Sequence, residues 1–198
     1  MNIKEELIKK WGEGIKLNNC WTQKELNFIG RFARLNVLFN PLNDISSYEL
    51  IFKNVKADRL LNFYNEFNGC KLFSDSLCIY GIQDNLSDDV YQTYDLNWEN
   101  NRIYQMLHLN EYLFFGSLGG QYLFAYKINS NNEIVYCINV DTGEIVYTFE
   151  NFDLLFSTLF NKLYDEYDKT GEKLHKNKEF RKIKSLYNKT TQIEYLEE

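Results

Sequence analysis

Residues 112–126 read YLFFGSLGGQYLFAY, and this stretch decides the fold. Two apolar runs, 112–115 and 122–126, lie on either side of a glycine-rich interval at 116–120. Glycine permits positive φ and close approach of two backbones, so the interval predicts a tight bend between strands. A phosphate-binding loop would continue into Lys and Ser or Thr at the start of a helix, whereas Gln121 and a strand follow here. The stretch therefore predicts an antiparallel strand pair.

The next segment predicts a hairpin and then a covering helix. β-Branched runs at 134–138 and 145–148 are joined across 141–143, whose sequence DTG favours a turn. Apolar residues then recur at helical spacing over 152–167. These residues are Phe152, Leu155, Phe156, Leu159, Phe160, Leu163, Tyr164 and Tyr167. Because a sheet with one apolar face needs a helix to cover it, the order of elements predicts the α+β class.

The N-terminal quarter of the chain is less regular. Apolar residues on one helical face predict a short helix over 3–11. A capping box that begins at Thr22 predicts a second helix over 22–33. Turn-forming residues make 36–48 an irregular segment, and 49–52 fits a short strand.

The middle of the chain predicts one helix, two short strands and an acidic loop. A third helix begins at Asp58 and ends before Gly69, which supplies a left-handed residue after the helix. Short strands follow at 72–73 and 77–80. Residues 85–101 are polar and acidic and are expected to form a loop, after which the next strand or a short helix begins.

Length and composition fit one domain with an appendage. The chain has 198 residues, of which 44% are hydrophobic, so it can bury a sizeable core. We expect a single antiparallel or mixed sheet packed against N-terminal and C-terminal helices over 1–168, and a basic, helical extension over 169–198. The first part carries 14 basic and 23 acidic side chains, and the extension carries 8 and 5. An acidic body disfavours direct nucleic-acid binding and favours basic partners.

The sequence predicts neither membrane insertion nor secretion. No stretch approaches the roughly 18–20 apolar residues that span a bilayer. The first residues are charged and lack the apolar region of a signal peptide. The expected location is the cytoplasm.

No motif in the chain predicts catalysis, a metal or a cofactor. The cysteines are Cys20, Cys70, Cys78 and Cys137; they form no CxxC pair, and without a secretion signal we expect buried or idle thiols. The only histidines are His108 and His175, too few for a zinc site at any usual spacing. No serine lies in a GxSxG turn. The neighbouring Asp88 and Asp89 lack the apolar shelter that a paired acid and base require.

Three places in the chain resemble the SUKH superfamily, the Smi/Knr-type domain. The first is the end of the third helix, Phe67-Asn68-Gly69, with the strands after it. The second is the strand pair at 113–126, similar to the family's "FG…GG…FAY" pattern, and the third is the hairpin with its following helix. One departure is Val55-Lys56-Ala57, which stands where the family usually has Leu-Pro before its third helix. The resemblance covers residues 5–168.

The resemblance implies a function by binding, without catalysis. Bacterial SUKH proteins are largely immunity proteins, each of which neutralises a cognate toxin, here expected to be basic and of nuclease type, by occluding its active site. Eukaryotic relatives are regulatory scaffolds, which is the alternative; an enzyme is a third hypothesis that lacks a site. Charge and expected exposure place the partner surface in the acidic loop. The candidate residues are Asp84, Asp88, Asp89, Tyr91, Tyr94, Asp95, Trp98 and Glu99.

Overall fold

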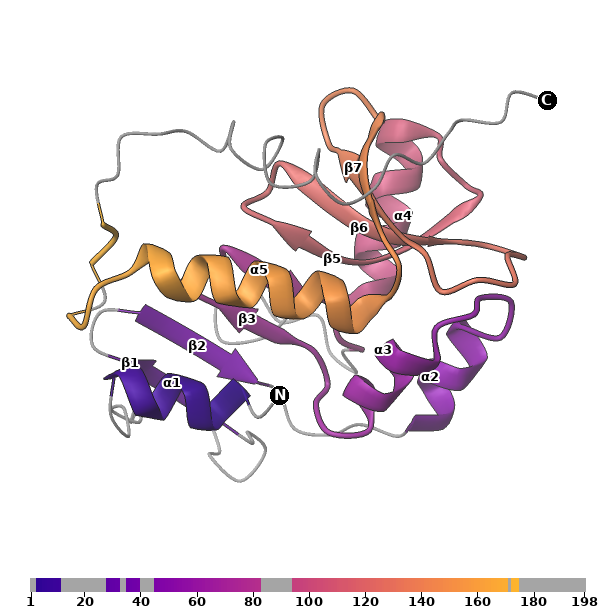
Figure 1. The fold of residues 1–198 in the computed structure, drawn as a ribbon. Helices are drawn as coiled ribbons and strands as arrows, with labels where there is room; N and C mark the ends of the chain where they lie inside the picture. Colours follow the sequence, from indigo (N-terminus) through magenta and orange to yellow (C-terminus); the bar gives the residue numbers. More distant parts are fainter. Residues whose placement is uncertain are drawn as a thin grey trace.

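One antiparallel sheet organises the molecule (Figure 1). The computed structural model describes residues 3–11, 28–32, 35–39, 45–82, 94–170 and 172–174. Within these residues, eight strands pair in sequence order, each antiparallel to its neighbours. The strands are β1 (Phe28–Phe32), β2 (Leu35–Phe39), β3 (Cys70–Leu72), β4 (Leu77–Ile79), β5 (Tyr112–Leu118), β6 (Tyr122–Lys127), β7 (Val135–Asn139) and β8 (Ile145–Phe149). The α+β class predicted from the sequence is confirmed.

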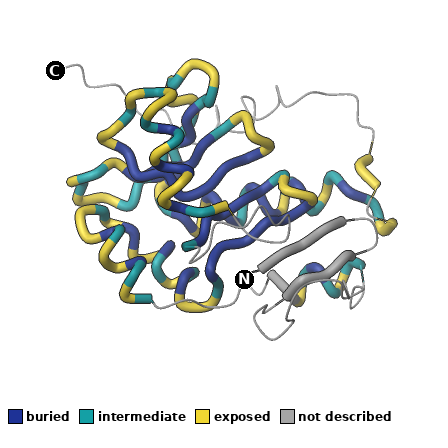
Figure 2. Tube along the Cα trace, turned by 180° about the vertical axis from the view of Figure 1, so that it is seen from behind, coloured by how far each residue is buried: buried dark blue, intermediate teal, exposed yellow. Residues whose placement is uncertain are grey.

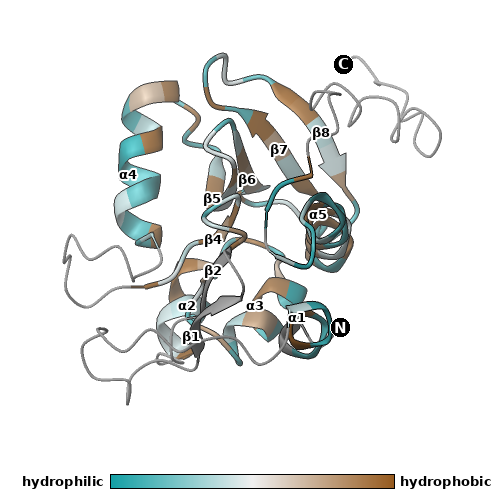
Figure 3. Cartoon of the chain, turned by 90° about the vertical axis from the view of Figure 1, so that its left-hand side faces the viewer, coloured by the Kyte–Doolittle hydropathy of each residue, from teal (hydrophilic) through white to brown (hydrophobic). Residues whose placement is uncertain are grey.

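Helices lie on both sides of this sheet. The described residues form α1 (Ile3–Trp11), α2 (Ile45–Ile51), α3 (Asp58–Tyr64), α4 (Leu96–Leu107) and α5 (Phe152–Glu166). Figure 3 shows α4 and α5 on opposite sides of the central strands. Figure 2 shows buried residues along these strands and along the helices beside them. The predicted helices over 3–11 and 152–167 are present, and the third begins at Asp58 as predicted but ends earlier, at Tyr64.

The helix α5 closes one face of the sheet with aromatic side chains. Its N-terminus is capped by Asn151, whose Oδ1 accepts from the Leu154 N–H at 3.0 Å. The Phe152 ring lies 6.0 Å from the ring of Phe115 on β5, which stacks on Tyr126 of β6 at 5.0 Å. Burial of such rings is a large stabilising contribution, so this face is the main core.

Strand β5 contains a β-bulge where the sequence predicts a bend. The strand continues through Gly116 to Leu118, and the turn to β6 is formed by residues 119–121. Phe114 pairs with Ala125 and Gly116 pairs with Phe124, so Phe115 is the additional residue. A Cβ on Gly116 would lie 2.5 Å from the carbonyl oxygen of Cys78. This glycine therefore permits close approach of β4 and does not form the bend, which corrects the prediction.

Three predictions for the rest of the chain are wrong. Residues 28–32, expected in a helix, form β1; apolar spacing in so short a run fits both helix and strand, and pairing with β2 decides. The segment 36–48, expected to be irregular, contains most of β2 and, from Ile45, the start of α2. Residues 49–52, expected to form a short strand, belong to the end of α2, where the Phe52 N–H donates to the Tyr48 carbonyl at 2.8 Å.

The predicted acidic loop ends earlier than expected, because residues from Leu96 onward form α4. The basic extension was predicted to be helical over 169–198. Its described residues, 169–170 and 172–174, form a turn and an isolated antiparallel bridge from Lys173 to Tyr167 instead of a helix, and the rest of it lies outside the described residues. No helix among the residues that the structure describes is long and apolar enough to cross a membrane.

Candidate functional site

Only four of the eight predicted partner-surface residues lie in the part of the chain that the structure describes. Asp84, Asp88, Asp89 and Tyr91 lie outside the described residues. Tyr94, Asp95, Trp98 and Glu99 lie at the N-terminal end of α4, on the side of the sheet away from α5. The geometry of the site is therefore built from α4.

Both ends of the interval 83–93 are held at one place. The Gly81 N–H donates to the Tyr94 carbonyl at 2.9 Å, and the Leu96 N–H donates to the Gly81 carbonyl at 2.7 Å. The next residue, Ile82, is held by Asn68: its N–H donates to Asn68 Oδ1 at 2.7 Å, and Asn68 Nδ2 donates to its carbonyl at 2.8 Å. These bonds fix the entry to α4 against the end of β4.

The two described carboxylates have roles inside the fold. Asp95 caps α4, because its Oδ1 accepts from the Trp98 N–H at 2.7 Å. Glu99 is 4% exposed. Its Oε2 accepts from Nε of Arg102 at 3.1 Å and from Nη2 at 2.7 Å. Glu99 was predicted to be an exposed acidic contact for a partner. Because it is buried and paired with Arg102, it is not available for that contact.

The exposed face of α4 instead carries three large side chains in a line. Trp98, Arg102 and Met106 are spaced four residues apart, which places them on one helical face. Trp98 is 50% exposed and Met106 is 49% exposed. The guanidinium carbon of Arg102 lies 5.7 Å from the Trp98 ring centroid, and its Nη1 lies 3.3 Å from the Met106 sulfur. We call these three residues the α4 stripe.

Tyr94 lies at the N-terminal side of the α4 stripe and is also exposed. Its ring stands edge-on to Tyr80 at 6.1 Å, and Lys71 Nζ lies 4.3 Å from its centroid. Partial burial raises the pKa of the Tyr94 hydroxyl. The hydroxyl is therefore a neutral hydrogen-bonding group at neutral pH.

The helix beneath the α4 stripe is attached to the sheet by a buried amide. Asn100 Nδ2 donates to the Phe114 carbonyl at 2.7 Å, and its Oδ1 accepts from the Phe114 N–H at 2.8 Å. Just past the end of β4, the Tyr80 N–H still donates to the Phe115 carbonyl on β5. Asn100 then pairs with both backbone groups of Phe114, as a residue of a neighbouring strand would. The α4 stripe is thus carried on a fixed helix.

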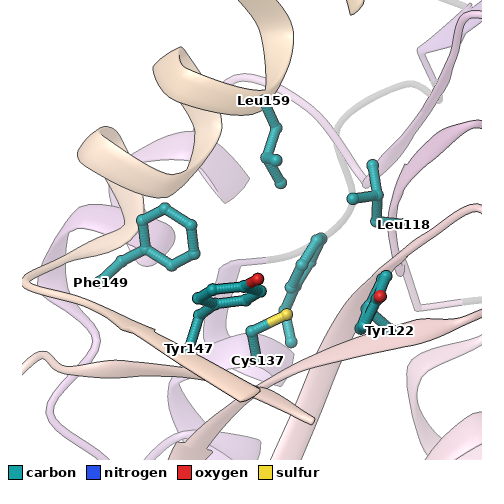
Figure 4. Close-up of a pocket in the computed structure, with 7 residues that line it drawn as sticks. Leu118, Tyr122, Cys137, Tyr147, Phe149 and Leu159 are labelled. Carbon is teal, nitrogen blue, oxygen red and sulfur yellow. The ribbon is translucent and has the colours of Figure 1, made fainter. Parts of the chain in front are cut away.

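The apolar pocket between the sheet and α5 has no room for a ligand (Figure 4). Its volume is about 10 Å³, and its accessible wall is entirely apolar. Such a space holds at most one water, and apolar walls give a water no partners. The lining residues include Leu118, Tyr122, Cys137, Tyr147, Phe149 and Leu159. Burial raises the pKa of Cys137 to about 12, so its thiol stays protonated there.

The described thiols and acidic groups form no reactive cluster. Cys70 and Cys78 are buried and free, and burial raises the pKa of both thiols, for Cys78 to about 12. Nucleophilic cysteines require the thiolate, so neither is activated. In the described part of the chain, no group of three or more His, Cys, Asp or Glu side chains is arranged to hold a metal. The geometry of the α4 stripe offers contact area and hydrogen-bond donors.

No protein-family model and no curated protein matches this chain. The similarity to the SUKH superfamily rests on the three sequence motifs, and membership remains a hypothesis. Of the three α4 stripe residues, only Trp98 was among the predicted partner-surface residues. Arg102 and Met106 were not, because the sequence did not predict one helix running from Leu96 to Leu107. Helical spacing from Trp98 is the signal that finds them.

Proposed function

We propose that this protein acts by binding another protein through the α4 stripe, as an immunity protein of SUKH type that covers the active site of a cognate toxin. The observation that carries the proposal is the exposed line of Trp98, Arg102 and Met106. Tryptophan, arginine and methionine are enriched in the buried centres of protein interfaces and are often the residues that contribute most to affinity.

The attachment of α4 to the sheet supports the same proposal. Binding costs free energy when mobile groups must be ordered, so a rigid surface binds more tightly than a flexible one. Asn100 fixes the helix to β5, and Glu99 fixes the Arg102 side chain by two hydrogen bonds to its carboxylate. Little further ordering is needed when a partner binds.

Net charge favours a basic partner at long range. The chain carries −6 overall, and charge of that sign speeds encounter with a positively charged protein. Toxins that cleave nucleic acids are expected to be basic, which agrees with the toxin hypothesis. Stable neutralisation would cover roughly 800 Å² on each side. The α4 stripe is therefore the proposed centre of a wider contact.

Co-expression tests this function. The toxin candidate is the product of the adjacent open reading frame, and the assay measures growth with each variant together with Kd by titration calorimetry. The double variant Trp98→Ala/Met106→Ala should bind about 30-fold or more weakly and lose protection. The matched control is Leu50→Ala/Leu154→Ala, which removes two other exposed apolar side chains, 66% and 43% exposed, from α2 and α5.

The outcomes separate the hypotheses. Wild-type affinity in the Trp98→Ala/Met106→Ala variant, with its urea midpoint unchanged, would exclude the α4 stripe as the interface. Binding to an endogenous partner through the α4 stripe without rescue of growth would identify a regulatory scaffold. Turnover of a substrate by the purified chain would contradict a binding function.

A further inference from the structure

The guanidinium group of Arg102 is held from one side only. It has five N–H donors. Its Nε and Nη2 each direct one donor to Glu99 Oε2, and Nη1 directs one to the Met106 sulfur at 3.3 Å. Within the described part of the chain, one N–H on each terminal nitrogen has no acceptor. A guanidinium with terminal N–H groups to spare can bind a carboxylate through both of its oxygens.

We propose that the partner places an Asp or Glu side chain on these two donors, with an apolar neighbour packed against Trp98 and Met106. This inference rests on the proposed function, because it assumes that the α4 stripe is the interface. It goes further by specifying which chemical group of the partner contacts Arg102. The partner's central contact is acidic and apolar, although its overall charge is expected to be basic.

Three features of the site favour a carboxylate. Arg102 remains 39% exposed at its side chain, so an anion can reach it. Glu99 is buried behind it and restrains the side chain, which lowers the ordering cost of a second bidentate contact. The Glu99 charge also offsets that of the arginine, so the site suits a singly charged anion better than a phosphate dianion.

The same geometry disfavours a basic anchor at the α4 stripe. Exposed aromatic rings bind cations through their faces. The Trp98 ring already has Arg102 at 5.7 Å, and the Tyr94 ring has Lys71 at 4.3 Å. A lysine or arginine from the partner would approach a ring beside an existing positive charge. Basic residues of the partner therefore belong at other places on the acidic surface.

A peptide-display experiment tests the anchor directly. A random 12-residue library is selected on the intact chain, and enriched sequences are synthesised with amidated C-termini so that only side-chain carboxylates remain. We expect enriched peptides to contain Asp or Glu beside an aromatic or aliphatic residue. Changing that acid to its amide should weaken binding about 10-fold or more, as should Arg102→Gln in the protein. The two changes together should weaken binding no further.

Controls keep folding and binding apart. Arg102→Gln leaves the buried Glu99 charge without its partner, so the double variant Glu99→Gln/Arg102→Gln serves as the control with both charges removed. Arg102→Lys keeps the charge and loses the two-point contact, so it should bind with intermediate affinity.

Each outcome either supports or overturns the acidic anchor. Some enriched peptides could require Trp98 and yet be rich in Lys or Arg, or bind the Arg102→Gln variant as tightly as the wild type. Either result would refute the acidic anchor, whereas the α4 stripe would still be the binding surface. A library without any Arg102-dependent binder also counts against it. A phosphoserine peptide that binds more tightly than its Glu counterpart would replace the carboxylate with phosphate. If no selected peptide and no toxin candidate required Trp98 for binding, the proposed function itself would be contradicted.

Discussion

Replacement of Asn100 by Ala is the most informative perturbation of this fold. Asn100 is buried, and its amide pairs with both the N–H and the carbonyl of Phe114. Alanine keeps the helix propensity high and removes the hydrogen-bond partners of both the Phe114 N–H and the Phe114 carbonyl. Each buried backbone group left without a hydrogen bond costs about 1–3 kcal/mol, so the expected loss is about 2–5 kcal/mol.

Urea unfolding measures this loss. With a slope of about 1–3 kcal/mol per molar urea, the midpoint should fall by about 1–2 M. The matched control is Asn101→Ala, the same change at the next position of α4, where the side chain is exposed. A surface substitution of that kind should change the free energy of unfolding by about 0.5 kcal/mol or less.

Asn100→Asp distinguishes the hydrogen bonds from packing volume. An aspartate of nearly the same size can accept from the Phe114 N–H but, when ionised, cannot donate to the Phe114 carbonyl. The variant should be unstable at neutral pH and recover part of its stability at acid pH, where the protonated acid can donate. Equal midpoints for Asn100→Ala and Asn101→Ala, or no pH effect in Asn100→Asp, would refute the argument that this amide holds α4 to β5.

The remaining predictions concern the sheet, the thiols and the two ion pairs of Arg59. Gly116→Ala should cost about 1–3 kcal/mol in urea unfolding, because its Cβ would meet the Cys78 carbonyl at 2.5 Å. Gly119→Asn should cost less, about 1 kcal/mol, because the turn is open and asparagine tolerates the positive φ of +57° there better than other side chains. The free energy of unfolding should fall as pH rises above about 9. Thiols of the unfolded chain have an ordinary pKa of 9.0 and lose their protons there, whereas burial in the folded chain raises the pKa of Cys78 and of Cys137 to about 12. Urea midpoints at pH 8 and pH 10 test the sign, and a higher midpoint at pH 10 would contradict it. Arg59→Ala, which removes ion pairs to Glu133 and Asp153, should lower the midpoint slightly at low ionic strength and not in 1 M NaCl.

The C-terminal half of the fold could be predicted because its signals are long and consistent. The helix α5 buries six apolar side chains at helical spacing, and the hairpin of β7 and β8 has a turn sequence between two β-branched runs. Such agreement between spacing, turn chemistry and propensity leaves little ambiguity. The bulge at Phe115 was not predictable, since the apolar pattern does not set the register in which β5 pairs with β6.

The helix α4 was missed because its buried face is partly polar. Only Leu96 and Ile103 are buried apolar residues on it, and the other buried positions are Glu99 and Asn100. A search for apolar periodicity finds too few residues there. The predicted partner surface and the α4 stripe share Trp98, but Glu99 was expected to be exposed and is buried. Glu99 can be buried because Arg102, one helical turn away, pairs with it. That pairing can be predicted only after the helix itself has been predicted.

Two buried asparagines determine where the proposed binding surface lies. Asn68 pairs with both backbone groups of Ile82, and Asn100 pairs with those of Phe114, so each replaces a strand partner beyond the end of β4. The helix is thus held by its inner polar side, and its outer side contributes little to folding. Substitutions of Trp98 and Met106, which are half exposed, should therefore reduce binding while stability stays constant, whereas substitution of Asn100 should reduce both. Because the two effects are separable, the surface can vary with its partner without loss of the fold.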